Sequence, residues 1–242
     1  MKQSLFTILQ NRPIARNTME LVLRGDVSGF TAPGQFAQIR LDGFFLRRPI
    51  SLCALEQDTL TLIYKEVGQG TRLLSSMQEG ALDLLTGLGN GYDLSCAGDR
   101  PLLLGGGVGV PPLYELARRL AARGLRPAAV LGFNTAEEVF YADQFAALCD
   151  LTLVTADGSA GQRGFVTDAL PPSGTYTYFY ACGPLPMLKA VHAAVPTSGQ
   201  LSLEERMACG FGACVGCSIQ TRSGVRRVCK DGPVFRKEEL LW

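Results

Sequence analysis

Four of the eight cysteines crowd into one segment, spaced Cys209-x4-Cys214-x2-Cys217-x11-Cys229, and this spacing constrains the local fold more than any other feature of the chain. Its first two intervals are those of plant-type [2Fe–2S] proteins, in which the fourth ligand returns from further along the chain. A four-cysteine zinc site usually pairs its ligands as two CxxC motifs, whereas this segment contains one. The spacing therefore favours a [2Fe–2S] cluster, with a zinc site and uncoordinated thiols as the alternatives.

Gly210, Gly212 and Gly216 are interleaved with these cysteines. A loop that wraps a cluster points several backbone N–H groups at sulfur, which requires φ values that glycine adopts freely. The other four cysteines are scattered singly, which does not resemble a disulfide framework, and in a reducing cytosol clustered cysteines indicate metal. The scattered cysteines are Cys53, Cys96, Cys149 and Cys182.

The composition and the amino-terminal sequence argue against a membrane or nucleic acid as a partner. The amino terminus, MKQSLFTILQNR, lacks an apolar core with a cleavage site, and no apolar run approaches the ~18 residues of a membrane helix. We therefore expect a cytoplasmic protein without a membrane partner. The 23 Lys and Arg residues are balanced by 22 Asp and Glu, which disfavours nucleic acid as a partner. Charged residues make up 19% of the chain, below the ~25% typical of soluble domains, so either another subunit covers some surface or the composition simply varies.

The first hundred residues are typical of a β-rich domain, because short apolar runs are separated by Gly and Pro. Strands at this spacing predict a small antiparallel barrel or sandwich, which we place in residues 1–98. One short helix is predicted over Thr71–Met77. The predicted strands are 18–24, 35–41, 49–55 and 59–67.

From Pro101 onward, predicted strands and helices alternate, which indicates a parallel sheet with nucleotide chemistry at the carboxyl ends of its strands. The fold class is therefore β followed by α/β. The nucleotide-binding domain spans 99–198, and a small C-terminal subdomain spans 199–242. The predicted strands are 102–104, 128–133, 151–155 and 176–181, and the helices are 111–123, 142–148 and 185–195. The C-terminal subdomain contains a strand at 201–203, the clustered cysteines and a hairpin that turns at Ser223-Gly224.

Two motifs in the β-rich part are candidates for binding a flavin nucleotide. In Arg47-Arg48-Pro49-Ile50-Ser51, an arginine beside a proline-stiffened strand can meet a diphosphate, and the serine can donate to a flavin ring. Gly68-Gln69-Gly70-Thr71 opens the short helix, where free N–H groups and the helix dipole favour phosphate. Taken alone, each motif is more often an ordinary basic turn or a plain helix cap.

Two further segments are candidates for binding a nicotinamide cofactor. Gly105-Gly106-Gly107-Val108-Gly109 lies between a predicted strand and a helix, but it does not match G-x-G-x-x-G in any register. It therefore predicts only a general strand–glycine–helix phosphate site. Cys182-Gly183-Pro184 follows the last predicted parallel strand, where small residues would let a nicotinamide ring lie close. Cys182 either packs there or takes a direct role.

Acid–base catalysis has no candidate residues in this chain. His192 is the single histidine, which makes a Ser-His-Asp or Cys-His hydrolase hard to build, and no carboxylate pair is poised for proton transfer. We therefore assign no catalytic residue. This suits redox chemistry, in which cofactors carry the reaction and the protein orients them.

Taken in order, these motifs resemble those of the ferredoxin–NADP reductase superfamily, and within it the electron-transfer subunits of NAD-dependent (class 1B) dihydroorotate dehydrogenases. The resemblance covers essentially the whole chain. It is sharpest in GGGVGVPPLYELA (105–117), LEERMACGFGACVGC (203–217) and VCKDGPVF (228–235). The last two separate this family from most reductases of the superfamily, which lack such an appended cluster loop.

The resemblance implies which residues bind each cofactor. The implied FAD contacts are Arg48, Pro49, Ile50, Ser51, Ile63, Tyr64, Lys65, Gly70 and Thr71. The implied NAD contacts are Gly105, Gly106, Gly107, Gly109, Cys182, Gly183 and Pro184. The implied [2Fe–2S] ligands are Cys209, Cys214, Cys217 and Cys229.

The resemblance also implies a partner, an FMN-containing catalytic subunit that oxidises dihydroorotate to orotate in pyrimidine (UMP) biosynthesis. Two catalytic and two electron-transfer subunits would form a heterotetramer, and electrons would pass from FMN through [2Fe–2S] and FAD to NAD+. Residues 134–138 (NTAEE) lack the arginine that a 2′-phosphate would need, which independently favours NAD over NADP.

Two other interpretations fit the sequence. The chain could be the flavin and iron–sulfur subunit of another redox complex, of the hydrogenase or transhydrogenase type. It could also be a zinc-stabilised binding or regulatory protein on a reductase-like scaffold, without turnover.

Overall fold

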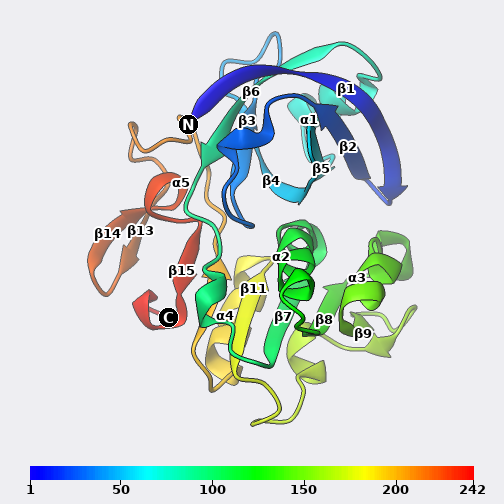
Figure 1. Cartoon of the computed structure of the whole chain (residues 1–242), viewed down its shortest axis with the longest axis vertical. Coiled ribbons are helices and arrows are strands. Elements are labelled where there is room, and N and C mark those ends of the chain that lie inside the picture. Colours follow the sequence, from blue (N-terminus) through cyan, green and yellow to red (C-terminus); the bar gives the residue numbers. More distant parts are fainter.

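The computed structural model describes residues 1–242 as a β-barrel, a helix-flanked sheet and a small C-terminal hairpin (Figure 1). The barrel is at the top of Figure 1 and the sheet below it, with the C-terminal strands, coloured orange to red, at one side of both. None of the helices is long and apolar enough to cross a membrane.

Six antiparallel strands close the barrel in the order β1-β2-β5-β4-β3-β6, which decides between the predicted barrel and sandwich. Alternate residues of β2 and β5 point inward, so that Leu21, Leu23 and Leu62 are fully buried in the barrel core. The barrel elements are β1 (Lys2–Ala15), β2 (Thr18–Arg24), β3 (Phe36–Ile39), β4 (Arg48–Leu55), β5 (Thr59–Lys65), α1 (Gln69–Ser76) and β6 (Ala81–Leu88).

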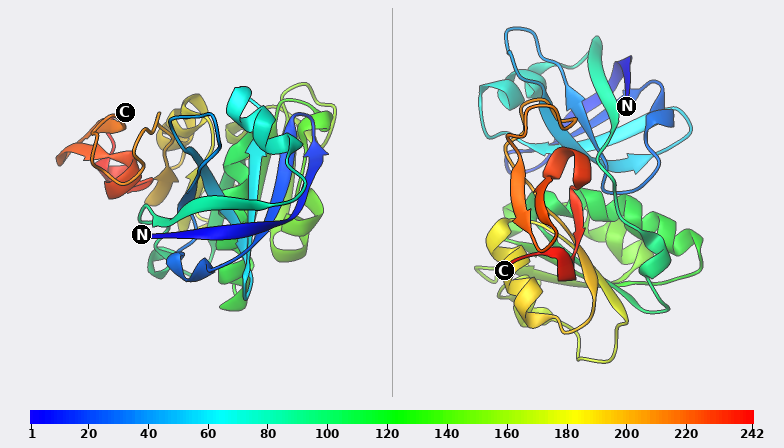
Figure 2. Two further views of the ribbon diagram at one scale, coloured as in Figure 1. Left: turned by 90° about the horizontal axis from the view of Figure 1, so that it is seen from above. Right: turned by 90° about the vertical axis from the view of Figure 1, so that its left-hand side faces the viewer.

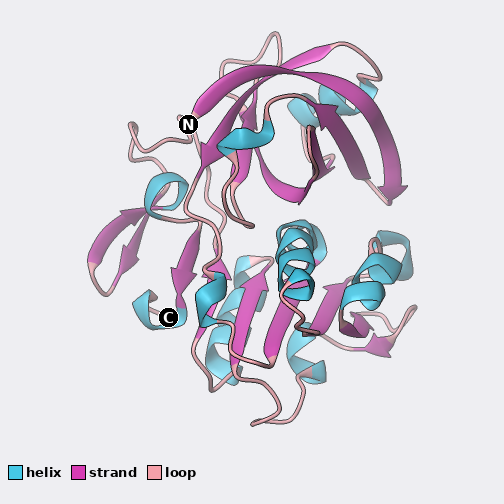
Figure 3. Ribbon diagram, in the orientation of Figure 1, coloured by secondary structure: helices cyan, strands magenta, loops and turns pink.

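The second sheet has the strand order β10-β9-β8-β7-β11-β12-β15, and β15 is antiparallel to its neighbour β12 while all other pairs are parallel. Successive leucines of β7 pack on opposite faces, Leu103 on the side of α2 and Leu102 and Leu104 on the side of α4. Figure 3 shows the helices lining this sheet. A fully apolar strand is expected where both faces are covered, and the predicted parallel sheet is confirmed.

The elements of this part lie close to their predicted positions, except that no strand was predicted at the position of β10. They are β7 (Pro101–Gly106), α2 (Val110–Ala122), β8 (Ala128–Phe133), α3 (Ala142–Leu148), β9 (Asp150–Thr155), β10 (Gln162–Arg163), β11 (Tyr178–Cys182) and α4 (Leu185–Ala194).

The C-terminal segment shares strands with the sheet. β12 (Gly199–Ser202) is parallel to β11, and β15 (Val234–Arg236) is antiparallel to β12. The predicted hairpin is present as β13 (Ser218–Thr221) and β14 (Gly224–Arg227), followed by the short helix α5 (Val228–Asp231). The right-hand view of Figure 2 shows this segment lying in front of both the barrel and the sheet. The division at residues 98 and 198 remains a prediction.

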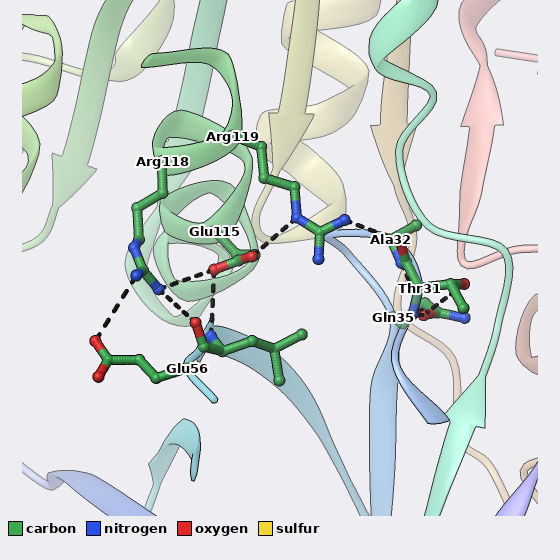
Figure 4. Close-up of polar contacts among 8 residues, drawn as sticks. Thr31, Ala32, Gln35, Glu56, Glu115, Arg118 and Arg119 are labelled. Atoms are coloured by element: carbon green, nitrogen blue, oxygen red, sulfur yellow. Dashed lines mark hydrogen bonds and ion pairs between the residues drawn. The ribbon is translucent and has the colours of Figure 1, made fainter. Parts of the chain in front are cut away.

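A buried carboxylate joins the barrel to α2 (Figure 4). Glu115 is 5% exposed, and its carboxylate accepts hydrogen bonds from Leu55 N (3.2 Å) at the end of β4 and from Arg118 Nη1 (3.2 Å) and Arg119 Nε (2.9 Å) on its own helix. Both arginines also contact the barrel: Arg118 donates a hydrogen bond to Leu55 O, and Arg119 donates one to Thr31 O. This network fixes the orientation of α2, and of the glycine loop before it, relative to the barrel.

Candidate functional site

A cavity of about 370 Å³ lies between the barrel and the sheet. Strands β4 and β5 form its barrel side, and the loop before α2, the end of β11 and the segment after β12 close the other side. Most of the predicted FAD residues line it, namely Arg48, Pro49, Ile50, Ser51, Ile63, Tyr64, Lys65 and Thr71. The other lining residues are Phe36, Val67, Val108, Cys182, Ser202, Leu203, Glu204, Glu205, Met207 and Pro233.

The two arginines of the RRPIS segment have different roles. Arg47 makes a bidentate pair with Asp83 of β6, with Nη1–Oδ1 at 3.0 Å and Nη2–Oδ2 at 2.9 Å, and so belongs to the barrel wall. Arg48 makes no ion pair with a carboxylate, and its Cζ lies 4.6 Å from the centre of the Phe44 ring. Of the two arginines, Arg48 is therefore the one whose guanidinium can bind an anionic group in the cavity.

The amino end of α1 lies against Arg48. A Cβ on Gly70 would be 2.4 Å from Arg48 Nε, so only glycine lets the guanidinium lie over the first turn. Thr71 Oγ1 accepts from the backbone N–H groups of Val67 (3.0 Å) and Gly68 (3.1 Å) and fixes the loop before the helix. The guanidinium and the helix dipole place positive potential at one end of the cavity, where a diphosphate would fit.

Strand β5 presents alternate side chains to the cavity. Tyr64 faces the barrel core, where its hydroxyl donates to Asn11 Oδ1 at 3.0 Å. Its neighbours Ile63 and Lys65 point to the other face, and Lys65 Nζ lies 3.4 Å from Glu138 Oε2 after β8. Of the three predicted FAD residues on this strand, Tyr64 can therefore offer only backbone groups to a cofactor.

The two predicted nicotinamide segments meet at the carboxyl ends of β7 and β11, where Gly105 is the strand neighbour of Cys182. A Cβ on Gly109 would be 2.3 Å from Cys182 O, and one on Gly106 would be 2.4 Å from Met187 Sδ. These glycines are needed because the loop, β11 and the start of α4 approach so closely. Val108 and Cys182 both line the cavity that contains the predicted FAD residues. A nicotinamide ring bound against these two residues would therefore face a flavin in the cavity.

Cys182 is 2% exposed, and burial raises the pKa of its thiol, with the charge of Glu204 adding to the rise. Side-chain hydrogen bonds to Ser202 and Tyr92 oppose this shift. Cys182 is therefore a neutral thiol at physiological pH. It can pack against a ring, but it is not activated as a nucleophile.

The cysteine loop has backbone N–H groups directed at sulfur. Cys209 Sγ accepts from Ala213 N (3.2 Å) and Cys214 N (3.4 Å), and Cys217 Sγ accepts from Cys229 N (3.4 Å). The loop turns at Gly210 and Gly212, whose φ values are +76° and +91°. Gly216 was expected to share this conformation, but the residue with a positive φ at that place is Val215, at +55°. Amides that point at sulfur are what an iron–sulfur loop requires.

The four cysteines form two pairs. The backbone N–H of Cys214 donates to Cys209 Sγ, and that of Cys229 donates to Cys217 Sγ. Two pairs of cysteines match a [2Fe–2S] cluster, in which each iron takes two cysteines.

The environments of the pairs differ. Desolvation raises the pKa of Cys209, but backbone hydrogen bonds, first that from Cys214, outweigh it and lower the pKa to about 6. Burial, and then the hydrogen bond with Cys217, raise the pKa of Cys229 to about 12. Arg227 Nη1 donates to Gly212 O at 2.7 Å and brings a positive charge to the loop. A cationic group there would stabilise bound thiolates.

The cavity and the cysteine loop share a wall. Phe36 and Leu203 line the cavity, and both belong to the hydrophobic core that contains Cys217 and Cys229. Neither residue was predicted to line the flavin site, because Phe36 was one apolar position in a predicted strand and Leu203 only the first residue of the LEERMACGFGACVGC segment. One apolar core therefore adjoins both candidate cofactor sites.

Residues 204–241 match the family model described as the iron–sulfur cluster binding domain of dihydroorotate dehydrogenase B. Two curated proteins, each named dihydroorotate dehydrogenase B (NAD(+)), electron transfer subunit, are similar over the full length. That of Geobacillus sp. (strain WCH70) is 46% identical, covering 100% of this chain and 99% of the relative. That of Bacillus pumilus (strain SAFR-032) is 43% identical, covering 99% of this chain and 98% of the relative.

The structure is also similar to a chain of a solved NADH-dependent reduced ferredoxin-NADP oxidoreductase, studied for flavin-based electron bifurcation. The TM-score is 0.88 and the identity 32%, and the match covers 99% of this chain and 90% of that chain. The predicted arrangement of a barrel followed by a nucleotide-binding sheet is therefore shared with a solved reductase.

Proposed function

The chain belongs to the family of electron-transfer subunits of NAD-dependent dihydroorotate dehydrogenase B, and from this premise we propose that it carries electrons from the FMN of a catalytic partner subunit to NAD+. It is thus an oxidoreductase component of pyrimidine biosynthesis that holds FAD and a [2Fe–2S] cluster. When bound, the cluster supplies one-electron transfer, and FAD accepts single electrons and gives up a hydride, so together they connect a partner flavin to NAD+.

The residues around the cavity have matching roles in this proposal. Arg48 and the amino end of α1 hold the diphosphate of FAD, with Gly70 leaving space for the guanidinium. The loop of Gly105–Gly109 and the turn at Cys182–Pro184 hold the nicotinamide cofactor on the opposite side. Ile63 and Phe36 exclude water from the flavin face. No side chain has to move a proton at a reacting atom, which fits the lack of a catalytic acid or base.

The proposal rests most heavily on the apolar wall shared by the cavity and the cysteine loop through Phe36 and Leu203. Electron transfer requires the two cofactors to be close and sheltered from water. A flavin in the cavity and a cluster held by Cys209, Cys214, Cys217 and Cys229 would be separated by these side chains.

We also propose how the chain assembles and where it acts. The cluster loop exposes Phe211 (45% exposed) and Val215 (61% exposed), and these are candidate contacts for the partner subunit. We expect a heterotetramer of two catalytic and two electron-transfer subunits in the cytoplasm. A cytoplasmic location fits eight cysteines that are all free thiols.

NAD+ is the proposed acceptor because the residues after β8 offer carboxylates and an amide. Lys65 Nζ lies 3.4 Å from Glu138 Oε2 and Arg16 Nη1 lies 3.3 Å from Glu137 Oε2, so these two cations already have carboxylate partners. A ribose hydroxyl needs no free cation, whereas the 2′-phosphate of NADP does.

The proposal is tested by purifying the chain anaerobically with its native partner and assaying NAD+ reduction. We expect NADH to form with dihydroorotate as the electron donor, and hydrogen and reduced ferredoxin to be inactive. NADH formed from hydrogen or ferredoxin but not from dihydroorotate would instead place the chain in another redox complex.

A further inference from the structure

The amide of Gln38 on β3 is buried without a hydrogen-bond partner. The residue is 0% exposed, and neither Nε2 nor Oε1 has a partner in the protein. Buried side-chain amides are nearly always satisfied, because an unpaired donor or acceptor loses its hydration without compensation. An amide left unpaired on both atoms therefore indicates a group that the protein chain itself does not supply.

The position of Gln38 indicates what this group is. A Cβ on Gly210 would be 2.1 Å from Gln38 Nε2, so the amide lies directly against the backbone of the cysteine loop, next to Cys209. Gly210 has φ +76° and no side chain in the way, which is what allows this approach. The nitrogen end of the amide, with its two N–H donors, is therefore the end that contacts the loop.

Gln38 also adjoins the candidate flavin site. In the β3–β4 ladder it is paired with Pro49 of the RRPIS segment. Side chains alternate along a strand, so Gln38 shares a face with Phe36, while Ala37 and Ile39 face the barrel core. Phe36 lines the cavity and packs in the core that holds Cys217 and Cys229, whereas Gln38 does not line the cavity. The amide is thus on the cysteine side of the shared wall.

We propose that Gln38 is a positioning residue that donates a hydrogen bond from Nε2 to a sulfur of the iron–sulfur site and so raises the reduction potential of the cluster. This inference rests on the proposed function, because it requires a cluster in the cysteine loop. Reduction adds negative charge to a cluster, and a hydrogen bond to sulfur stabilises the reduced form more than the oxidised form. The barrel then adjusts the potential of a cluster bound by a distant part of the chain.

The first test replaces the amide with an apolar side chain of similar size, Gln38→Leu, in the full chain with its cofactors. An EPR-monitored redox titration should show the cluster midpoint lowered by about 59 mV, which is a tenfold change in the one-electron equilibrium constant. The matched control is Gln220→Leu, the same change at an exposed glutamine on β13, which should leave the midpoint unchanged. A Gln38→Leu protein with full iron and sulfide content and an unchanged midpoint would overturn the inference.

A second measurement uses the wild-type side chain, so it does not depend on how well the variant loads its cluster. Protein made by cell-free synthesis with glutamine labelled with ¹⁵N at the side-chain nitrogen is reduced and examined by pulsed EPR. We expect a ¹⁵N hyperfine coupling to the cluster that the Gln220→Leu protein retains. A reduced wild-type cluster without any such coupling would show that no glutamine amide is bonded to it. Wild-type protein without iron and sulfide would instead contradict the proposed function.

Discussion

The contact between the barrel and α2 depends on one buried carboxylate, that of Glu115. Replacing it with an amide, Glu115→Gln, should lower the stability of the folded chain. The change preserves size, so it creates no cavity. Both carboxylate oxygens of Glu115 accept hydrogen bonds from donors, two on Oε2 and one on Oε1. A glutamine has one oxygen, so in either orientation its NH2 group must face an N–H donor.

The cost follows from the contacts that remain. With its oxygen toward Leu55 N and Arg118, the glutamine retains two hydrogen bonds and loses the 2.9 Å bond from Arg119. A hydrogen bond to a charged group contributes about 1.5–3 kcal/mol, and both arginines are 32% exposed, so water recovers part of the loss. We therefore expect a loss of about 2 kcal/mol, which corresponds to a fall in melting temperature of about 4–8 °C for a chain of this size.

Thermal unfolding of the FAD-loaded chain, followed by circular dichroism and by release of flavin fluorescence, measures this shift. The matched control is Asp150→Asn, which removes a carboxylate from an ion pair with Arg126 at a similar distance of 2.7 Å. Both partners of that pair are more than half exposed, so the control should have a negligible effect. Equal shifts in the two variants would refute the idea that the burial of Glu115 makes its network important.

Three further predictions concern the cofactors and the barrel. Cys214→Ser should eliminate the cluster and electron exchange with the partner, while FAD still passes electrons from NADH to an added dye; loss of dye reduction as well would mean that the cysteine loop also holds the flavin. Arg48→Ala should weaken FAD binding about 10–100-fold in a fluorescence titration, since it removes one charged contact to the diphosphate, and an unchanged dissociation constant would exclude that contact. The Arg47 hydrogen bonds lower the pKa of Asp83, so this carboxylate stabilises the fold above its unfolded pKa of about 3.9 and loses that contribution as the pH falls further. Urea unfolding should therefore show a wild-type advantage over Asp83→Asn at pH 7 that shrinks below about pH 4, and an advantage constant down to pH 3 would contradict this.

Much of the fold could be predicted from the sequence, because its strongest patterns are local. The apolar run of β7, the prolines at the start of α2 and the turn at Ser223-Gly224 each specify their own element. The barrel strands β1 and β6 were not predicted. β1 has a largely solvated outer face and contains Pro13, so its apolar alternation is weak. β12 was placed with the C-terminal subdomain, although its pairing partners, β11 and β15, are set by tertiary contacts.

In the candidate site, too, local motifs could be predicted from the sequence, whereas roles set by tertiary contacts could not. The cysteine spacing and the glycine loop identified residues that the fold brings together, because each motif carries its own geometry. The distinct roles of Arg47 and Arg48 could not be predicted, since they depend on Asp83, which lies on another strand. The role of Gln38 could not be predicted either. Its strand was predicted, but its amide contacts the cysteine loop at Gly210, which lies far along the chain.

The most direct test of the electron path is to reduce the anaerobic complex of this chain and its partner with dihydroorotate, and then to add NAD+ while following the cluster by EPR. We predict a signal of the reduced [2Fe–2S] cluster that appears with dihydroorotate and disappears as NADH forms, and that Cys214→Ser protein gives neither the signal nor NADH. NADH formed from dihydroorotate at an undiminished rate in the Cys214→Ser complex would contradict the account.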